Sequence, residues 1–196
     1  MTRLLITLMF GGCLLCPAGT IDSYTTGNYQ GSGIFEESFT TPAGGPWTNI
    51  TFNFFSDSAG TTPTAAGTAY LLGQAYFGTP AALSGATNGF LASSTGISGG
   101  IYIFDSSVDL LPNTQYWIAT NAAVSTYFSD TPYSGGHFYQ ALNPFYGFAP
   151  QAQGAVDFSL NGQAEAAPEP ACAALGFAGL GALAMIMRRR RSHTTL

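Results

Sequence analysis

The sequence predicts an all-β domain over residues 21–164, built as an antiparallel β-sandwich or jelly roll, with a signal peptide before it and one transmembrane helix after it. Two observations favour this class. Short segments rich in aromatic and β-branched residues alternate with turns that contain glycine, proline or asparagine. No stretch of ten or more residues before the C-terminal tail shows the 3.6-residue periodicity of an amphipathic helix.

The N-terminus has the pattern of a secretory signal peptide over residues 1–20. Arg3 supplies a basic start, residues 4–15 form an apolar run, and small residues follow. The run is too short to span a bilayer comfortably, which favours cleavage after Ala18 or at one of the next two residues. Two alternatives are a lipoprotein cysteine at Cys16, against which a leucine rather than a small residue precedes it, and a buried N-terminal helix.

The strands of the domain follow from local patterns. Residues 47–54 alternate apolar and polar side chains, as a half-buried strand does. In the segment at 110–119, Pro112 and Asn113 predict a turn, after which Tyr116 and Ile118 face opposite to Trp117. Six segments are short, apolar and rich in aromatic or β-branched residues, and we predict strands there: 69–77, 101–104, 116–119, 125–128, 137–142 and 155–160.

Charge is distributed very unevenly along the chain. There is no lysine, and the five arginines are Arg3 and the run 188–191, whereas all ten acidic residues lie between Asp22 and Glu169. Because phosphate contacts require lysine or arginine, the domain is not expected to bind nucleic acid. An anionic membrane surface would repel it as well. All three cysteines lie outside 21–164, so the domain must be stabilised by packing and not by disulfides.

The C-terminal region, residues 165–196, combines three elements in a fixed order. Pro168, Glu169 and Pro170 come first, then seventeen apolar or small residues at 171–187, then Arg188, Arg189, Arg190 and Arg191. A helix over 171–187 would be about 25 Å long, at the lower limit for a membrane span. The arginines are expected to stay in the cytoplasm, which places the domain on the outer side of the inner membrane. The alternative is an ordinary single-pass anchor.

This order of elements resembles the PEP-CTERM sorting tail, and the resemblance covers residues 167–191. It implies that a membrane-embedded exosortase is a partner, that it recognises Pro168-Glu169-Pro170, and that it removes the helix. It also implies an inner-membrane precursor that reaches the cell surface or the extracellular matrix of a bacterium, often one that makes exopolysaccharide. The chain departs from the pattern by extending to Leu196 beyond the arginines. The segment 110–119 is also similar to a strand of the choice-of-anchor β-sandwich domains that precede such tails.

No group of residues predicts an active site, and we expect the protein not to be an enzyme. His137 is the one histidine in the domain, and no nucleophile motif surrounds a serine. Adjacent residues such as Glu36 and Glu37 point to opposite faces when they lie on a strand, and Asp105 and Asp109 flank a turn, which argues against a glycosidase pair.

Two binding hypotheses remain for the domain. The acids at 105–109 and Asp57 are candidates for a structural Ca²⁺ site, the alternative being solvated turn residues, and no other cofactor is expected. An aromatic cluster at 127–148 is a candidate carbohydrate-stacking surface, the alternative being core packing. The protein is therefore predicted to be a structural or adhesive surface component or, alternatively, a carbohydrate-binding module with exopolysaccharide as partner. The stacking residues would be Tyr127, Tyr133, Tyr139 and Tyr146.

Overall fold

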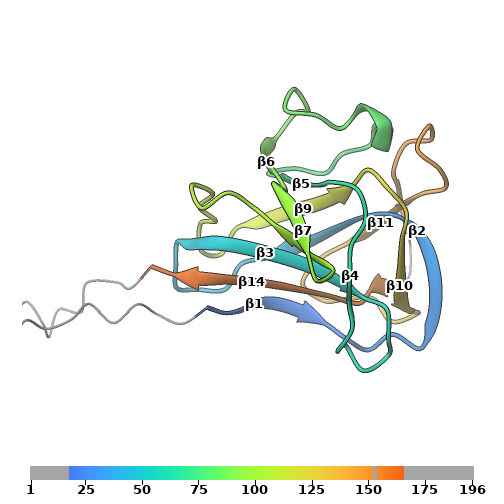
Figure 1. Ribbon diagram of the computed structural model, residues 1–196, viewed down its shortest axis with the longest axis horizontal. Coiled ribbons are helices and arrows are strands. Elements are labelled where there is room, and N and C mark those ends of the chain that lie inside the picture. The colour runs from blue at the N-terminus through green and yellow to red at the C-terminus, as the bar shows by residue number, and fades with distance from the viewer. Residues whose placement is uncertain (1–17, 152–153, 166–196) are drawn as a thin grey trace, which may run out of the picture. The chain divides into compact units, whose positions relative to one another are not determined.

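The computed structural model describes residues 18–151 and 154–165. These residues form two antiparallel β-sheets with a shared apolar core, an arrangement consistent with a β-sandwich (Figure 1). The prediction of an all-β, antiparallel domain is therefore confirmed. Within the described ranges, no helix has the length and apolar character needed to cross a membrane. The predicted transmembrane helix at 171–187 and nearly all of the predicted signal peptide lie outside the described residues.

The first sheet contains six strands. Its central strand is β3, which covers the predicted segment at 47–54 and pairs with three neighbours. β1 begins at Gly19, two residues before the expected start of the domain, so cleavage after Ala18 would leave this strand whole. The strand order is β1 (Gly19–Tyr24), β14 (Phe158–Ala164), β3 (Trp47–Phe55), β8 (Ile101–Ile103) and β7 (Gly96–Ser98), with β4 (Pro63–Thr64) also beside β3.

The second sheet contains eight strands built around the long strand β2. β9 pairs with the C-terminal half of β2, and β10 pairs with its N-terminal half. A single 3-10 turn, η1 (Pro80–Ala82), lies in the connection between β5 and β6. The strand order is β12 (Ala149–Pro150), β11 (Phe138–Ala141), β2 (Tyr29–Thr40), β9 (Gln115–Thr120), β5 (Ala69–Leu72) and β6 (Phe90–Ser93), with β10 (Val124–Ser129) joined to β2 and to β13 (Ala155–Val156).

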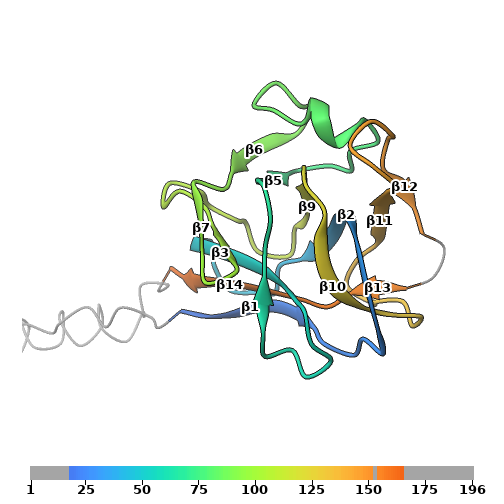
Figure 2. The same ribbon diagram turned by 45° about the vertical axis from the view of Figure 1, so that its right-hand side comes forward.

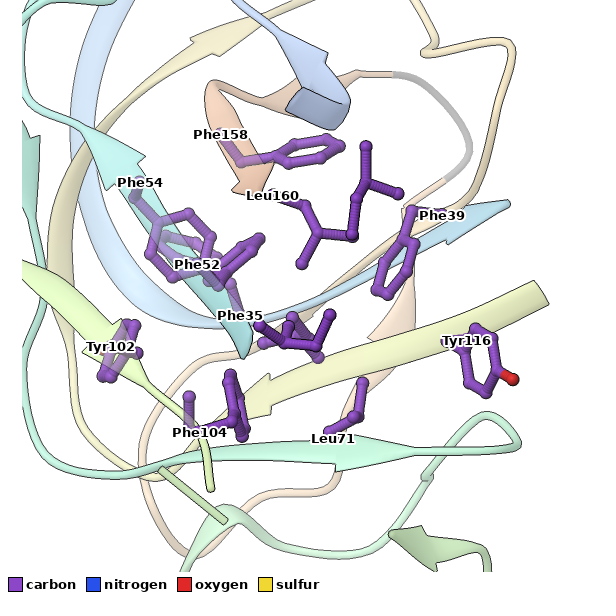
Figure 3. Close-up of a cluster of buried hydrophobic side chains, with 14 of the residues drawn as sticks. Phe35, Phe39, Phe52, Phe54, Leu71, Tyr102, Phe104, Tyr116, Phe158 and Leu160 are labelled. Atoms are coloured by element: carbon purple, nitrogen blue, oxygen red, sulfur yellow. The ribbon is translucent and has the colours of Figure 1, made fainter. Parts of the chain in front are cut away.

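Aromatic side chains from both sheets fill the main core, which is the apolar cluster between the sheets (Figure 3). Phe35 on β2 lies with its ring centroid 5.9 Å from that of Phe54 on β3, in an edge-to-face contact. Phe52 meets Phe54 at 4.9 Å in the same geometry. Fully burying each such ring contributes about 1.5–3 kcal/mol, which is how a domain without disulfides is stabilised.

Two predicted strands differ from the structure. The strand predicted at 69–77 ends at Leu72, because the backbone N–H of Gly73 bonds to the carbonyl of Gly89 and the chain leaves the sheet. The strand predicted at 155–160 is split at Asp157. β13 pairs with β10 in the second sheet and β14 pairs with β3 in the first, so the chain crosses between sheets at this residue.

Candidate functional site

The second sheet has a covered outer face, which points away from the main core. Along β2 the side chains alternate, so Phe35 and Phe39 enter the main core while Ile34 joins a second apolar cluster on the other side. This outer cluster also includes Leu72 of β5, and Trp117 packs against it. Tyr116 and Ile118 lie in the main core, which confirms the prediction that they face opposite to Trp117.

Two loops cover this outer face, and together we call them the cap: residues 73–89 and residues 142–148. They lie side by side in Figure 2: the first contains η1 and connects β5 to β6, and the second connects β11 to β12. The backbone N–H of Ala81 donates to the carbonyl of Pro144 at 3.1 Å, and that of Phe148 donates to the carbonyl of Gly78 at 3.2 Å. Gly147 permits the contact, since a Cβ there would lie 2.5 Å from the carbonyl oxygen of Phe77.

A buried carboxyl group anchors the cap to the sheet. Glu36 is fully buried, and its Oε1 accepts a hydrogen bond from the backbone N–H of Tyr76 at 2.8 Å. Its Oε2 is buried without a hydrogen-bond partner among the described residues. Burial raises the pKa of Glu36 to about 8, so the group is largely protonated at neutral pH. No lysine or arginine occurs between Arg3 and Arg188 to offset a charge there.

Glu37 points the opposite way, as the sequence predicted. It belongs to the same face of β2 as Phe35 and Phe39, and it is 1% exposed. Within the described part of the chain, neither carboxyl oxygen has a hydrogen-bond partner of ordinary geometry. Burial raises the pKa of Glu37 well above its usual value. Since Glu36 and Glu37 lie on opposite faces of the sheet, they do not form the carboxylate pair of a glycosidase.

The cap contains a pocket of about 530 Å³ within residues 74–88. Its lining is uncharged and combines aromatic rings, amides, hydroxyl groups and small apolar side chains. No acidic or basic residue occurs anywhere between Asp57 and Asp105, which includes this whole loop. The lining residues with chemical character are Gln74, Tyr76, Phe77, Ser84, Thr87 and Asn88, and three alanines complete the wall.

The hydroxyl groups of the pocket are fixed by the loop itself. The backbone N–H of Ser84 donates to Oγ1 of Thr87 at 3.0 Å, and that of Ala86 donates to Oγ of Ser84 at 3.3 Å. Each hydroxyl therefore accepts from the backbone and keeps its own hydrogen for an outside acceptor. The amide side chains of Gln74 and Asn88 are exposed. Each amide offers one acceptor and two donor hydrogens to a ligand.

Four large apolar or aromatic residues of the cap loops are exposed. Phe77 is 61% exposed, Leu142 86%, Phe145 80% and Tyr146 61%. We call these four residues the cap patch. Phe77 also lines the pocket, so the patch and the pocket share one residue. Exposed apolar groups gathered on a soluble surface mark sites of contact with partners or ligands.

The four tyrosines proposed as a stacking surface lie in different environments. Tyr127 is half-buried on β10, and Tyr146 is exposed in the cap. Tyr139 is 8% exposed and belongs to the outer cluster. Tyr133 packs against the main core, and its hydroxyl donates to Oδ2 of Asp22. The structure thus leaves only Tyr146 of the four with a largely exposed ring.

The calcium candidates are engaged in local turns. Asp57 accepts from the backbone N–H of Thr61 at 2.8 Å and from its hydroxyl at 2.7 Å, and hydrogen bonds to Thr62 and Thr61 lower the pKa of Asp57 to about 2. Asp105 accepts from the backbone N–H of Ser107 at 2.9 Å. In residues 18–151 and 154–165, no three or more His, Cys, Asp or Glu side chains are placed to hold a metal ion.

Two further sets of predicted residues can be placed. His137 is exposed, and its backbone N–H donates to Oγ of Ser38 at 2.6 Å. Pro168, Glu169, Pro170 and Arg188 to Arg191 lie outside the described residues. Sequence reasoning missed the pocket residues of the cap, because residues 73–77 were expected to continue a strand and no motif in 78–88 predicted a binding site. The one available signal is the uncharged stretch between Asp57 and Asp105, which contains the loop but does not locate the pocket within it.

Comparison with known proteins identifies no relative of this chain. No protein-family model, curated protein or solved structure matches the chain.

Proposed function

We propose that this is an exported bacterial protein of the cell surface or extracellular matrix, with an exosortase sorting tail and a non-catalytic adhesive β-domain. The observation that carries the domain's role is the cap patch, in which Phe77, Leu142, Phe145 and Tyr146 are all exposed. Apolar side chains exposed together favour association with another surface. The absence of lysine and arginine from the domain argues against nucleic acid and anionic lipid as that surface.

The proposed location of the protein rests on the sequence patterns at its two ends. The predicted signal peptide and the arginine run at 188–191 each support a location of the domain outside the inner membrane. The two prolines of Pro168-Glu169-Pro170 favour an extended backbone and remove two backbone donors, which suits binding in an enzyme cleft. Glu169 adds a charge at the membrane edge. We infer an inner-membrane precursor that an exosortase converts to the surface form.

We further infer that the two sheets form a jelly roll. When β1, β2, β3, β5, β6, β8, β9 and β14 are numbered one to eight along the chain, the first sheet has the order 1-8-3-6 and the second 2-7-4-5. This interleaved order is that of a jelly roll, and the hairpin of β11 and β12 adds to the edge of β2. Lectin domains use the same architecture, although a fold alone does not assign a function.

Mass spectrometry of the mature C-terminus tests the sorting proposal. In a host with an active exosortase, the native protein should lack residues 171–196. Changing Pro168-Glu169-Pro170 to three alanines should leave membrane insertion unchanged, because the apolar run and the arginines remain, and should abolish removal of the helix. If the native protein ends at Leu196 in such a host, the tail is an anchor only and the proposal is wrong.

Retention on an apolar surface tests the adhesive role. The chain should adsorb to alkyl-coated beads, and the double variant Phe145→Ser, Leu142→Ser should adsorb several-fold less. Both positions are largely exposed, so the variant should fold normally. A matched variant at Leu111, which is exposed on another loop, should adsorb as the native chain does. If the Leu111 variant lost as much adsorption as the double variant, the adsorption would be nonspecific and would not support an adhesive role for the cap.

A carbohydrate-binding module is the second candidate function. The placement of Tyr127, Tyr133, Tyr139 and Tyr146 does not supply the joint stacking surface that this candidate would need. The pocket in the cap is a different observation in its favour, and it leads to a specific ligand class.

A further inference from the structure

We propose that the pocket within residues 74–88 binds one residue of a neutral glycan, with the face of a sugar ring on Phe77 and its hydroxyl groups bonded to Gln74, Asn88, Ser84 and Thr87. The inference rests on the proposed surface location of the domain, where such glycans occur. It names the ligand of the cap and moves the predicted sugar site away from the four tyrosines.

The chemistry of the lining matches a sugar. Each hydroxyl group of a neutral sugar is at once a donor and an acceptor, and the amides of Gln74 and Asn88 present both functions. Ser84 and Thr87 add two donors, because their oxygens already accept from the loop backbone. Phe77 is 61% exposed at the pocket and offers an aromatic face for the apolar face of a sugar ring. An apolar wall with a few placed polar groups is the usual composition of a ligand pocket.

The absence of basic side chains favours neutral sugars over anionic ones as ligands of the pocket. No charged side chain lines the pocket, and none occurs between Asp57 and Asp105. The domain as a whole carries acidic residues and no lysine or arginine. Phosphates, sulfates and uronates would therefore meet a repulsive field without a single cationic partner. Nucleotides and anionic polysaccharides are excluded on the same ground.

The pocket is held in place by its surroundings, so a ligand need not order the loop. Oε1 of Glu36 accepts a hydrogen bond from the backbone N–H of Tyr76 at 2.8 Å and so holds this part of the loop against the sheet. The ring of Tyr76 meets Phe148 edge-on, and its hydroxyl donates to the carbonyl of Thr79 at 3.1 Å. The N–H of Ala81 is bonded to the neighbouring loop at Pro144. A site shaped before binding loses less free energy to ordering of the loop than a mobile one does.

The test uses the full-length chain in detergent micelles. Binding of cellohexaose, dextran and galactomannan is measured by microscale thermophoresis, with alginate as the anionic counterpart. The native chain should bind at least one neutral probe and not alginate. Phe77→Ala and Asn88→Ala should each weaken that binding about tenfold. Phe77→Tyr should restore it, because the aromatic face is kept.

Leu111→Ala is the control, since Leu111 is 57% exposed, close to the 61% of Phe77, and lies outside both the cap patch and the pocket. It should bind the probe as the native chain does, and all variants should keep the native melting temperature. No binding of any neutral probe up to about millimolar concentration overturns the proposal. Equal weakening by Leu111→Ala overturns it as well, and so does unchanged binding in both Phe77→Ala and Asn88→Ala. These outcomes leave the sorting tail untouched, because its processing is read at the C-terminus.

Discussion

The hydroxyl group of Thr120 replaces backbone pairing at Phe35. The backbone N–H of Phe35 donates to Oγ1 of Thr120 at 3.2 Å, and the same hydroxyl donates to the carbonyl of Phe35 at 3.2 Å. Thr120 is the last residue of β9 and is fully buried. It lies where β2 changes its pairing from β9 to β10, so a side chain satisfies the backbone groups that the interrupted ladder would leave unpaired.

Replacing Thr120 by valine should destabilise the fold without changing its core volume. The valine methyl group offers neither a donor nor an acceptor, so both backbone groups of Phe35 become buried and unsatisfied. We expect the free energy of unfolding to fall by about 2–4 kcal/mol, measured by urea unfolding. Thr120→Ser keeps the hydroxyl and should lose much less. A valine variant that loses no more stability than the serine variant would show that the hydrogen bonds to Phe35 do not carry the effect.

Removing the carboxylate of Asp157 should loosen the crossing between the sheets. Its two oxygens accept from the backbone N–H of Gly27 at 2.8 and 3.1 Å, which ties the turn before β2 to the point where β13 becomes β14. Asp157→Ala leaves that buried N–H unpaired and should lower the free energy of unfolding by about 1.5–3 kcal/mol.

Two variants check this assignment by thermal unfolding. Asp157→Asn keeps one acceptor oxygen and should fall between the native protein and Asp157→Ala. Gly27→Ala should be destabilising as well, because its Cβ would lie 2.7 Å from Oδ2 of Asp157. An Asp157→Ala protein as stable as the native one would show that the crossing does not depend on this contact.

Stability should decrease as the pH rises from about 4.5 to 8. Glu36 and Glu37 are held protonated in the fold by burial, which raises the pKa of Glu36 to about 8 and that of Glu37 well above its ordinary value of 4.5. In the unfolded chain both glutamates lose their protons above their ordinary pKa of 4.5. Between that pH and the raised pKa values of the fold, the native state binds more protons than the unfolded chain, so stability falls as the pH rises. The expected slope is up to about 1.4 kcal/mol per pH unit for each group.

Chemical unfolding at pH 4.5, 6, 7 and 8 measures this slope. Glu36→Gln keeps the acceptor for the N–H of Tyr76 without a titrating proton, and should reduce the slope by about half. Asp57, whose pKa is lowered to about 2, acts in the other direction, and its contribution is lost only as the pH falls below its ordinary value of 3.8. A stability that rises from pH 5 to 8 would contradict the protonated state of both glutamates.

Neutralising Arg188 to Arg191 should have a different effect from changing Pro168-Glu169-Pro170. In the proposed sorting tail the arginines keep the end of the predicted helix in the cytoplasm, so four neutral residues should let uncleaved protein appear outside the cell. The full-length fraction in the medium is measured by immunoblot and intact mass. Four lysines in the same positions keep the charge and should retain the native distribution. Retention of the neutral variant in the membrane would mean that the apolar run alone stops transfer.

The sequence by itself determined which segments alternate apolar and polar side chains, and it determined that the domain contains no lysine or arginine. The strand at 47–54 was predicted because Ile50, Phe52 and Phe54 recur at every second residue, and all three are buried. Such a pattern is local, because a strand with one buried face and one solvent-exposed face alternates apolar and polar side chains along its own sequence. The absence of lysine and arginine from the domain, and with it the prediction of weak phosphate binding, likewise follows from the sequence without the fold.

Only the tertiary structure decided the features that depend on two-sided burial. β2 escaped prediction because Ile34 to Phe39 are buried on both faces, by the main core and by the cap, and two of those residues are glutamates. A strand covered on both faces loses the alternation by which it is recognised. The pocket depends in the same way on contacts between distant segments, such as Glu36 with Tyr76 and Ala81 with Pro144, which no local pattern encodes.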